Sequence, residues 1–269
     1  MKKDKLTAIV VFDIDGVIRD VGNSYRKAIA DTVEKFTDGA WRPTMEDLDN
    51  LKSEGIWNND WEASQELTYR YFESQERSRR ELTINYNHLV EFFQSRYRGQ
   101  NPEFFNGYIA EEPLLISPSY LQQLSDNQVG WGFFSGATRG SAEYVLKKRL
   151  AIANPVLVAM EDAPSKPDPT GLLSAIAIIE ASRGRGEVAD NSDCPVFYLG
   201  DTVADMYTVV RAKEVRPERN WIAIGILPPH VQSSPERQAN YSQKLKDSGA
   251  AIIFSNVEEL TIQELMTLM

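Results

Sequence analysis

The chain has 269 residues, of which 42% are hydrophobic, and its formal net charge is −10. This composition predicts a folded protein with one large domain or two smaller ones, and an acidic chain without a long basic run is not expected to bind nucleic acid. A single cysteine excludes an intrachain disulfide, and no apolar stretch reaches the roughly 18 residues of a membrane helix, so we expect a cytoplasmic protein with no membrane association.

Short apolar runs alternate with helical stretches over most of the chain. Runs rich in Val, Ile and aromatic residues predict buried strands of a parallel sheet at 8–12, 129–134, 156–160, 195–199, 221–227 and 250–254. Stretches with helical periodicity lie at 139–151, 169–182, 203–215, 235–249 and 256–269. The alternation predicts an α/β fold with a doubly wound parallel sheet.

Residues 21–112 differ because they contain no convincing strand. Helical patterns are found there at 24–36, 64–80 and 84–97. An insertion of this length is expected to form a smaller α-helical domain of its own. We therefore predict an α/β core made of residues 1–20 and 113–269, with the return hinge at 106–120.

Polar residues follow four of the predicted strands at the point where each strand ends. They are Asp13, Asp15, Ser135, Gly136, Lys166, Asp201 and Asp205. Ligands of open α/β sheets bind outside the carboxyl ends of the strands, so these residues are expected on one rim. Closely packed carboxylates favour a hard cation such as Mg²⁺, and a hydroxyl, a glycine N–H at a helix N-terminus and a lysine suit a phosphoryl group. Gly16 permits a sharp turn after the two acids. The residues alone thus indicate metal-assisted phosphoryl chemistry.

Four motifs in this order, DIDGV, SGATR, KPDP and GDTVAD, resemble the haloacid dehalogenase-like (HAD) superfamily. The likeness is to its phosphatase branch, with a helical C1-type cap domain inserted after the first motif, and it extends over nearly the whole chain. It implies a Rossmann-like core and a Mg²⁺ cofactor. It also implies hydrolysis of a small phosphorylated metabolite through an aspartyl-phosphate intermediate.

The resemblance implies a catalytic role for each core motif. Asp13 would be the nucleophile, and Asp15 would be the general acid that later serves as the base for water. Ser135 and the Gly136 N–H would hold the phosphoryl group, and Lys166 would neutralise charge on it. The plainer alternatives are a helix-capping serine and an exposed loop lysine.

The resemblance also implies the ligands of the metal. These are Asp13, the backbone carbonyl of Asp15, Asp201 and Asp205, the last binding either directly or through water. Asp201 and Asp205 are four residues apart, so both can face the same point from the start of a helix. We expect Thr202 between them to cap that helix.

Substrate specificity is expected to reside in the inserted domain, because a core of this kind serves many substrates. The segment 55–64 places Asn58, Asn59 and Asp60 between two tryptophans, which could read hydroxyl groups or an amine. An Asx turn that caps a helix would explain the same residues equally well. Arg139, close behind Ser135 in the chain, is a further candidate for substrate contact.

Two other functions stay open at this point. A phosphomutase acting on a sugar phosphate would keep both aspartates of the first motif, but relatives of that kind carry a histidine soon after it, and 21–31 has none. A non-catalytic binding member of the family is disfavoured by the intact acids, serine and lysine. The partner we expect is a small phosphorylated substrate, and the chain is expected to be a monomer or a homodimer.

Overall fold

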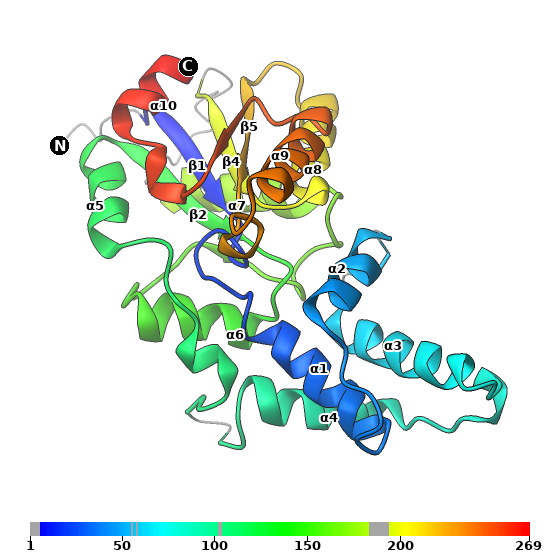
Figure 1. Ribbon diagram of the computed structural model, residues 1–269. Coiled ribbons are helices and arrows are strands. Elements are labelled where there is room, and N and C mark those ends of the chain that lie inside the picture. The colour runs from blue at the N-terminus through cyan, green and yellow to red at the C-terminus, as the bar shows by residue number, and fades with distance from the viewer. Residues whose placement is uncertain (1–5, 55, 58, 102–103, 183–193) are drawn as a thin grey trace. The chain divides into compact units, whose positions relative to one another are not determined.

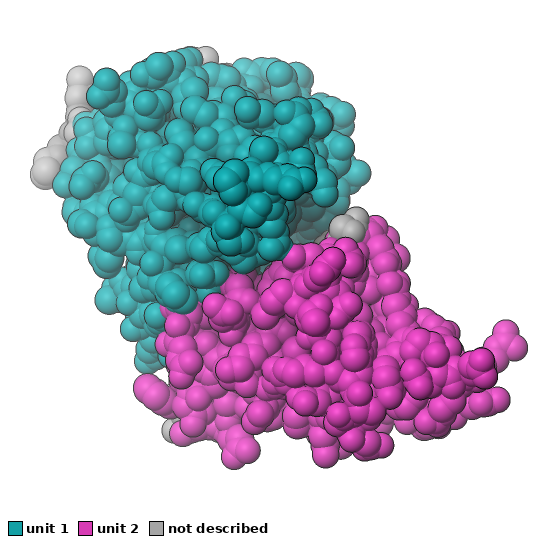
Figure 2. All heavy atoms as spheres, in the orientation of Figure 1, with its two compact units in different colours: residues 1–20, 113–269 teal, residues 21–112 magenta. Residues whose placement is uncertain are grey.

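The structure is a computed structural model, and it describes residues 6–54, 56–57, 59–101, 104–182 and 194–269. The chain divides into two compact units, which are coloured separately in Figure 2. Residues 1–20 and 113–269 form the core unit, and residues 21–112 form the inserted unit.

The core unit is built on six parallel strands in the order β3-β2-β1-β4-β5-β6 (Figure 1). The strands are β1 (Ala8–Phe12), β2 (Val129–Phe134), β3 (Leu157–Val158), β4 (Val196–Gly200), β5 (Trp221–Ile226) and β6 (Ile252–Phe254). The helices of this unit are α5 (Pro118–Asp126), α6 (Arg139–Glu143), α7 (Thr170–Ser182), α8 (Val203–Val215), α9 (Pro235–Asp247) and α10 (Ile262–Leu268). The predicted α/β fold with a doubly wound parallel sheet is confirmed.

The position of β1 in the middle of the sheet explains why its sequence is apolar throughout. Val10 and Phe12 belong to one apolar cluster, and Ile9 and Val11 belong to the other. Side chains of α5, α6 and α10 pack into the first cluster, and those of α7, α8 and α9 pack into the second. A strand covered on both faces needs apolar residues at every position rather than at alternate ones.

Several element boundaries differ from the prediction. The predicted helix at 139–151 is the short α6 followed by a π-helical turn, Tyr144–Arg149. Helix α5 was not predicted, although Ser117 caps it and Pro118 stands at its first turn, which is a readable start signal. The core unit resumes at Pro113, which lies within the segment 106–120 predicted as the return hinge.

The two segments of the core unit that flank the insertion are paired with each other. The Asp20 N–H donates to the Pro113 carbonyl at 2.8 Å, and the Leu115 N–H donates to the Ile18 carbonyl at 2.8 Å. Arg19 and Leu114 form an antiparallel bridge between these bonds. The loop after β1 is therefore fixed to the core at the point where the insertion begins.

The inserted unit is helical, with α1 (Tyr25–Phe36), α2 (Met45–Ser53), α3 (Asp60–Ser74) and α4 (Tyr86–Tyr97). Helix α1 packs against both α3 and α4. Helix α2 was not predicted; Thr44 and Asp47 start it with a reciprocal capping box. Within the described ranges, no helix of either unit combines the length and apolarity needed to cross a membrane.

Candidate active site

The site begins at the carboxyl edge of the sheet. Asp13, Ser135 and Asp201 directly follow β1, β2 and β4, which are neighbours in the sheet, and all three residues are buried. The register places Phe12 opposite both Phe133 and Leu199, so the three strands end at the same level. Parallel pairing therefore brings residues more than 180 positions apart in the sequence to one rim, as expected for a ligand site of an open α/β sheet.

Lys166 connects two of the buried acids. Its Nζ lies 2.8 Å from Oδ1 of Asp13 and 2.7 Å from Oδ1 of Asp205. The rings of Phe134 and Tyr198 flank the ammonium, with centroids 5.1 and 5.5 Å away. A lysine so enclosed is held by charge on one side and by aromatic faces on another, so it is not the exposed loop residue of the plainer alternative.

The carboxylate of Asp205 is fully engaged. Its Oδ2 accepts hydrogen bonds from the Thr202 N–H at 2.9 Å and the Thr202 hydroxyl at 2.6 Å. Its Oδ1 accepts from the Tyr198 hydroxyl at 3.0 Å and pairs with Lys166. A carboxylate offers about four acceptor positions, and these contacts use all of them. Thr202 is the N-cap of α8, as predicted, and the capping box ties Asp205 to the helix start.

Asp201 and Gly16 fit closely together. Gly16 has a φ of +77°, and a Cβ atom there would lie 2.2 Å from Oδ2 of Asp201, so no other residue fits this turn. The Tyr241 hydroxyl of α9 donates to the Asp201 backbone carbonyl at 2.9 Å. In the described part of the chain, no hydrogen bond or ion pair is recorded for the Asp201 carboxylate itself.

Three carboxylates gather around one ammonium. Oxygen atoms of Asp13, Asp201 and Asp205 lie within 4.8 Å of one another. Burial, partly offset by Lys166, raises the pKa of Asp13 to about 7. Burial and the charges of Asp205 and Asp13 raise the pKa of Asp201 well above its usual value. Although burial opposes it, Lys166 and the Thr202 hydrogen bonds hold the pKa of Asp205 below its usual range.

This imbalance fits a hard divalent cation. Mg²⁺ and similar ions take oxygen ligands, and they relieve the repulsion that raises the pKa values of Asp13 and Asp201. Asp13 and Asp201 have the oxygen atoms to bind such an ion. Asp205 would first have to release one of its present partners.

Asp15 is not one of these three carboxylates, although its charge also contributes to the raised pKa values of Asp13 and Asp201, and it pairs with Arg19. The Nε and Nη2 atoms of Arg19 lie 2.7 and 2.6 Å from Oδ1 of Asp15. Arg19 was not singled out from the sequence. The readable signal was an arginine four residues after the second acid, within an otherwise apolar turn.

The loop after β2 holds the candidates for phosphate contact. The Ser135 hydroxyl is buried and accepts a hydrogen bond from the Ala137 N–H at 3.1 Å. Gly136 has open space where a Cβ would stand. Helix α6 begins only at Arg139, so the Gly136 N–H is three residues before the helix and not at its first turn. The Arg139 side chain forms ion pairs with Asp162 and Glu143.

Of the three substrate candidates in the inserted unit, Asn58 is outside the described residues. Asn59 is the N-cap of α3, and its Oδ1 accepts from the N–H groups of Trp61 and Glu62 at 2.9 and 3.3 Å. Asp60 pairs with Lys52 at 2.7 Å. The structure thus gives Asn59 the capping role that the sequence left as one of two alternatives.

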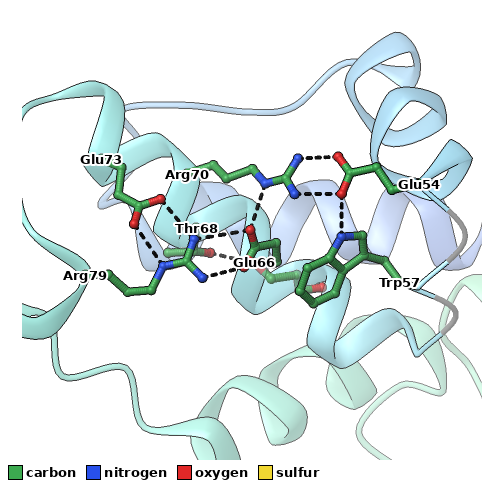
Figure 3. A network of polar contacts seen from close by, with 8 residues as sticks. Glu54, Trp57, Glu66, Thr68, Arg70, Glu73 and Arg79 are labelled. Atoms are coloured by element: carbon green, nitrogen blue, oxygen red, sulfur yellow. Dashed lines mark hydrogen bonds and ion pairs between the residues drawn. The ribbon is translucent and has the colours of Figure 1, made fainter.

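The inserted unit has its own buried acid, and its surroundings are different (Figure 3). Glu66 pairs with Arg70 at 2.8 Å and with Arg79 at 2.8 Å. Each arginine then binds one more carboxylate, Glu54 for Arg70 and Glu73 for Arg79. The network has two arginines for three carboxylates, but the two outer carboxylates are exposed to water, so the buried Glu66 is compensated without a further cation.

Fold and site together define a doubly wound α/β protein with a buried acid–lysine cluster at the carboxyl edge of its sheet. A family model described as haloacid dehalogenase-like hydrolase matches residues 7–211. The chain belongs to this family. The match covers the strands and motifs that carry Asp13, Ser135, Lys166 and Asp201, as the resemblance of the motifs implied.

Solved structures of the same fold include two from microorganisms. Phosphatase Tt82 from Thermococcus thioreducens is 21% identical, has a TM-score of 0.64, and is matched over 81% of this chain and 92% of its own. A phosphonoacetaldehyde hydrolase-like protein from Oleispira antarctica is 15% identical, with a TM-score of 0.64 and coverage of 99% and 93%. At these identities the likeness establishes the fold alone.

A curated relative differs in length. The imidazoleglycerol-phosphate dehydratase of Phytophthora nicotianae is 26% identical over 251 residues, which is 91% of this chain. The chain spans only 50% of the length of that relative.

Proposed function

We propose that the protein hydrolyses phosphate monoesters of small metabolites. The observation that carries the proposal is the buried Lys166 ammonium, which lies within 2.8 Å of the carboxylates of Asp13 and Asp205 at the carboxyl edge of the sheet. A fixed ammonium beside a carboxylate nucleophile can neutralise the charge that collects on a transferring phosphoryl group. Membership of a hydrolase family supports the same reaction class.

In the proposed mechanism Asp13 attacks phosphorus while the bond to the leaving oxygen breaks, and Asp15 gives a proton to that oxygen. Water then attacks the aspartyl-phosphate, Asp15 accepts a proton from it, and inorganic phosphate and free Asp13 result. Ser135 and the Gly136 N–H hold the phosphoryl oxygens. Lys166 stays positively charged, because Asp13 and Asp205 raise its pKa despite its burial.

Mg²⁺ is the proposed cofactor, held by the carboxylates of Asp13 and Asp201 and by the backbone carbonyl of Asp15. When bound, it supplies positive charge to a phosphoryl oxygen. We place Asp205 in contact with the ion through water, since Tyr198, Thr202 and Lys166 already occupy its acceptor positions.

The inserted unit is proposed as the cap that selects the substrate. Arg139 of the core unit and Asp60 of the inserted unit are partly exposed and are our candidates for contacts to the rest of the substrate, together with Asn58. Asn59 would act through the start of α3 rather than by direct contact.

The name of the half-matched relative suggests a substrate class. A dehydratase leaves a phosphate ester in place, so a phosphatase joined to such an activity would have an imidazole-bearing ester available. We propose that small imidazole-bearing phosphate monoesters, including imidazoleglycerol phosphate, are the substrates to try first.

The test is phosphate release from a panel of monoesters with Mg²⁺ and with chelator. The panel holds imidazole-bearing, sugar and amino-alcohol phosphates, phosphoglycolate and nucleotides. Release is expected to require metal and to fall on the order of 10³-fold or more in Asp13→Asn. Asp126→Asn, the same change on the exposed end of α5, is the control and should leave the rate unchanged. No release from any ester, or equal release by Asp13→Asn, would contradict the proposal.

A further inference from the structure

Among the described residues of the core unit, Arg19 is the most deeply buried cation. It has no exposed surface, and it is the largest fully buried side chain among the described residues. Its partner Asp15 keeps 36% of its side chain exposed. The pair therefore consists of a cation inside the protein and an acid that reaches the surface of the core unit.

The backbone fixes the position of Arg19. The Gly16 N–H donates to the Arg19 carbonyl at 3.0 Å, and Asp15 and Arg19 form a short bridge across the turn. On the other side Arg19 is bridged to Leu114. The next residue, Asp20, is hydrogen-bonded to Pro113. With its main chain held on both sides, the Arg19 side chain extends from a fixed point, and its complete burial limits where the guanidinium can lie.

Arg19 is an unusual residue for a buried position. Burying a guanidinium is costly, and the ion pair with a half-exposed acid by itself adds little stability. The neighbouring residues Ile14, Val17 and Ile18 are fully buried and apolar, so an apolar side chain at position 19 would suit the local packing.

What Arg19 does to Asp15 is specific. Both nitrogens approach the same oxygen, Oδ1, at 2.7 and 2.6 Å. For Oδ2 no hydrogen bond or ion pair is recorded within the described ranges. A carboxylate held at one oxygen by a hydrogen bond from Nε and by the charge of Nη2 cannot rotate freely, so its other oxygen keeps a fixed direction.

We propose that Arg19 is a positioning residue for the proton transfers of Asp15, an inference that rests on the proposed function. Arg19 holds Oδ1 so that Oδ2 carries the proton to the leaving oxygen as the phosphorus–oxygen bond breaks and the bond to Asp13 forms. The same Oδ2 then takes a proton from the water that releases phosphate. Arg19 itself keeps its charge throughout and touches neither substrate nor phosphorus.

The test compares two esters in Arg19→Met and Arg19→Lys. An alkyl phosphate needs a proton on its leaving oxygen, whereas 4-nitrophenyl phosphate releases a stable phenolate without one. The value of kcat/KM reports the steps up to formation of phospho-Asp13. For Arg19→Met we expect it to fall on the order of 100-fold with the alkyl ester and less than about threefold with the aryl ester. Arg19→Lys keeps the charge and should show a smaller, same-signed difference.

A purely structural role for Arg19 predicts another pattern. A misfolded or loosened site would lower kcat/KM for both esters by the same factor, and that result in a folded variant overturns the inference. Arg219→Met is the matched control, since Arg219 is also largely buried and pairs with Glu180 but stands before β5, at the opposite edge of the sheet. It should show no difference between the esters.

Two further outcomes keep the test decisive. Circular dichroism and thermal unfolding show whether Arg19→Met folds. If it does not, Arg19→Lys takes its place, and an equal loss of kcat/KM with both esters again overturns the inference. A wild-type protein that hydrolyses neither ester overturns the proposed function itself, and the role of Arg19 with it. A wild-type protein that hydrolyses both, with no ester difference in the variants, overturns only the role of Arg19.

Discussion

The two units of this protein each bury acidic side chains, but they compensate the charge differently. In the core unit, Asp13, Asp201 and Asp205 lie together with Lys166 as the cation between them. In the inserted unit, Glu66 is matched by two arginines, each of which binds a further carboxylate. The first group has one cation for three buried acids, whereas the buried Glu66 alone has two, so the first is suited to take up a cation and, with it, a charged ligand.

The pKa values express the same contrast. Burial raises the pKa of Asp13 to about 7. In the inserted unit, burial of Asp31 is outweighed by Tyr108, Arg42 and Arg96, which hold its pKa below the usual range. A buried acid with a lowered pKa is already satisfied within the fold. A buried acid with a raised pKa needs a proton or a metal ion, and such raised pKa values are common in functional sites.

The largest effect on this contrast should come from Lys166→Met, which removes the cation of the core group. Phosphate release is expected to fall by about 10²- to 10³-fold, because the charge that faces the phosphoryl group is lost. The free energy of unfolding without metal should fall by about 3 kcal/mol, since Asp205 loses a buried partner. A phosphate-release assay measures the rate, and urea unfolding measures the free energy of unfolding.

Lys147→Met is the control for that prediction. Lys147 is exposed and pairs with Glu143 at 3.0 Å, so its loss should change neither quantity appreciably. A Lys166→Met variant as active as wild type would mean that the core group is balanced in some other way.

Much of this site could be predicted from the sequence, since parallel strands bring their ends together and each end carried a polar motif. The hydrogen bond from Tyr198 to Asp205 could not be predicted. In the sequence Tyr198 looks like an ordinary strand residue, and only the fold brings its hydroxyl to the acid. Arg19 was not identified from the sequence because the turn at Gly16 determines that it pairs with Asp15. Helices α2 and α5 were missed because short amphipathic segments carry little periodicity, although their caps were readable.

The second prediction uses pH and metal. Because the pKa of Asp13 in the folded, metal-free protein is about 7, above its usual value, protonated Asp13 favours the folded state at low pH, and this contribution is lost as the pH rises from its usual pKa to about 7. A cation must displace the proton of Asp13 at pH 5.5 but meets the Asp13 carboxylate at pH 8. With Mg²⁺ near 100 times its Kd, we expect about 2.7 kcal/mol of stabilisation at pH 8 and clearly less at pH 5.5.

Thermal unfolding with and without Mg²⁺ at the two pH values makes this measurement. Asp201→Asn, which removes one proposed ligand, should abolish most of the shift at pH 8. An equal shift at both pH values would show that the bound cation does not depend on these carboxylates.

The third prediction concerns the Glu66 network of the inserted unit. Glu66→Gln should lower the free energy of unfolding by about 1–2 kcal/mol, because a buried acceptor of two charged donors is weakened while both arginines remain accessible to water. Glu73→Gln removes a carboxylate that binds the same Arg79 at the surface, and it should have a smaller effect. Urea unfolding followed by circular dichroism compares the two, and equal losses would mean that burial of Glu66 adds nothing.

The smallest expected effect is that of Tyr198→Phe, which tests whether the core group is as constrained as its geometry indicates. The change removes one hydroxyl that donates to Asp205 and leaves the ring beside Lys166 in place. We expect a loss of about 1 kcal/mol in the free energy of unfolding, the value of one buried hydrogen bond. Tyr207→Phe, on the exposed side of α8, is the control and should be neutral.

Freed of one donor, Asp205 also gains an acceptor position for a cation, so Tyr198→Phe should bind Mg²⁺ at least as tightly as wild type. Weaker Mg²⁺ binding in a folded variant would instead show that the Tyr198 hydroxyl helps to hold Asp205 in the position that the metal site needs.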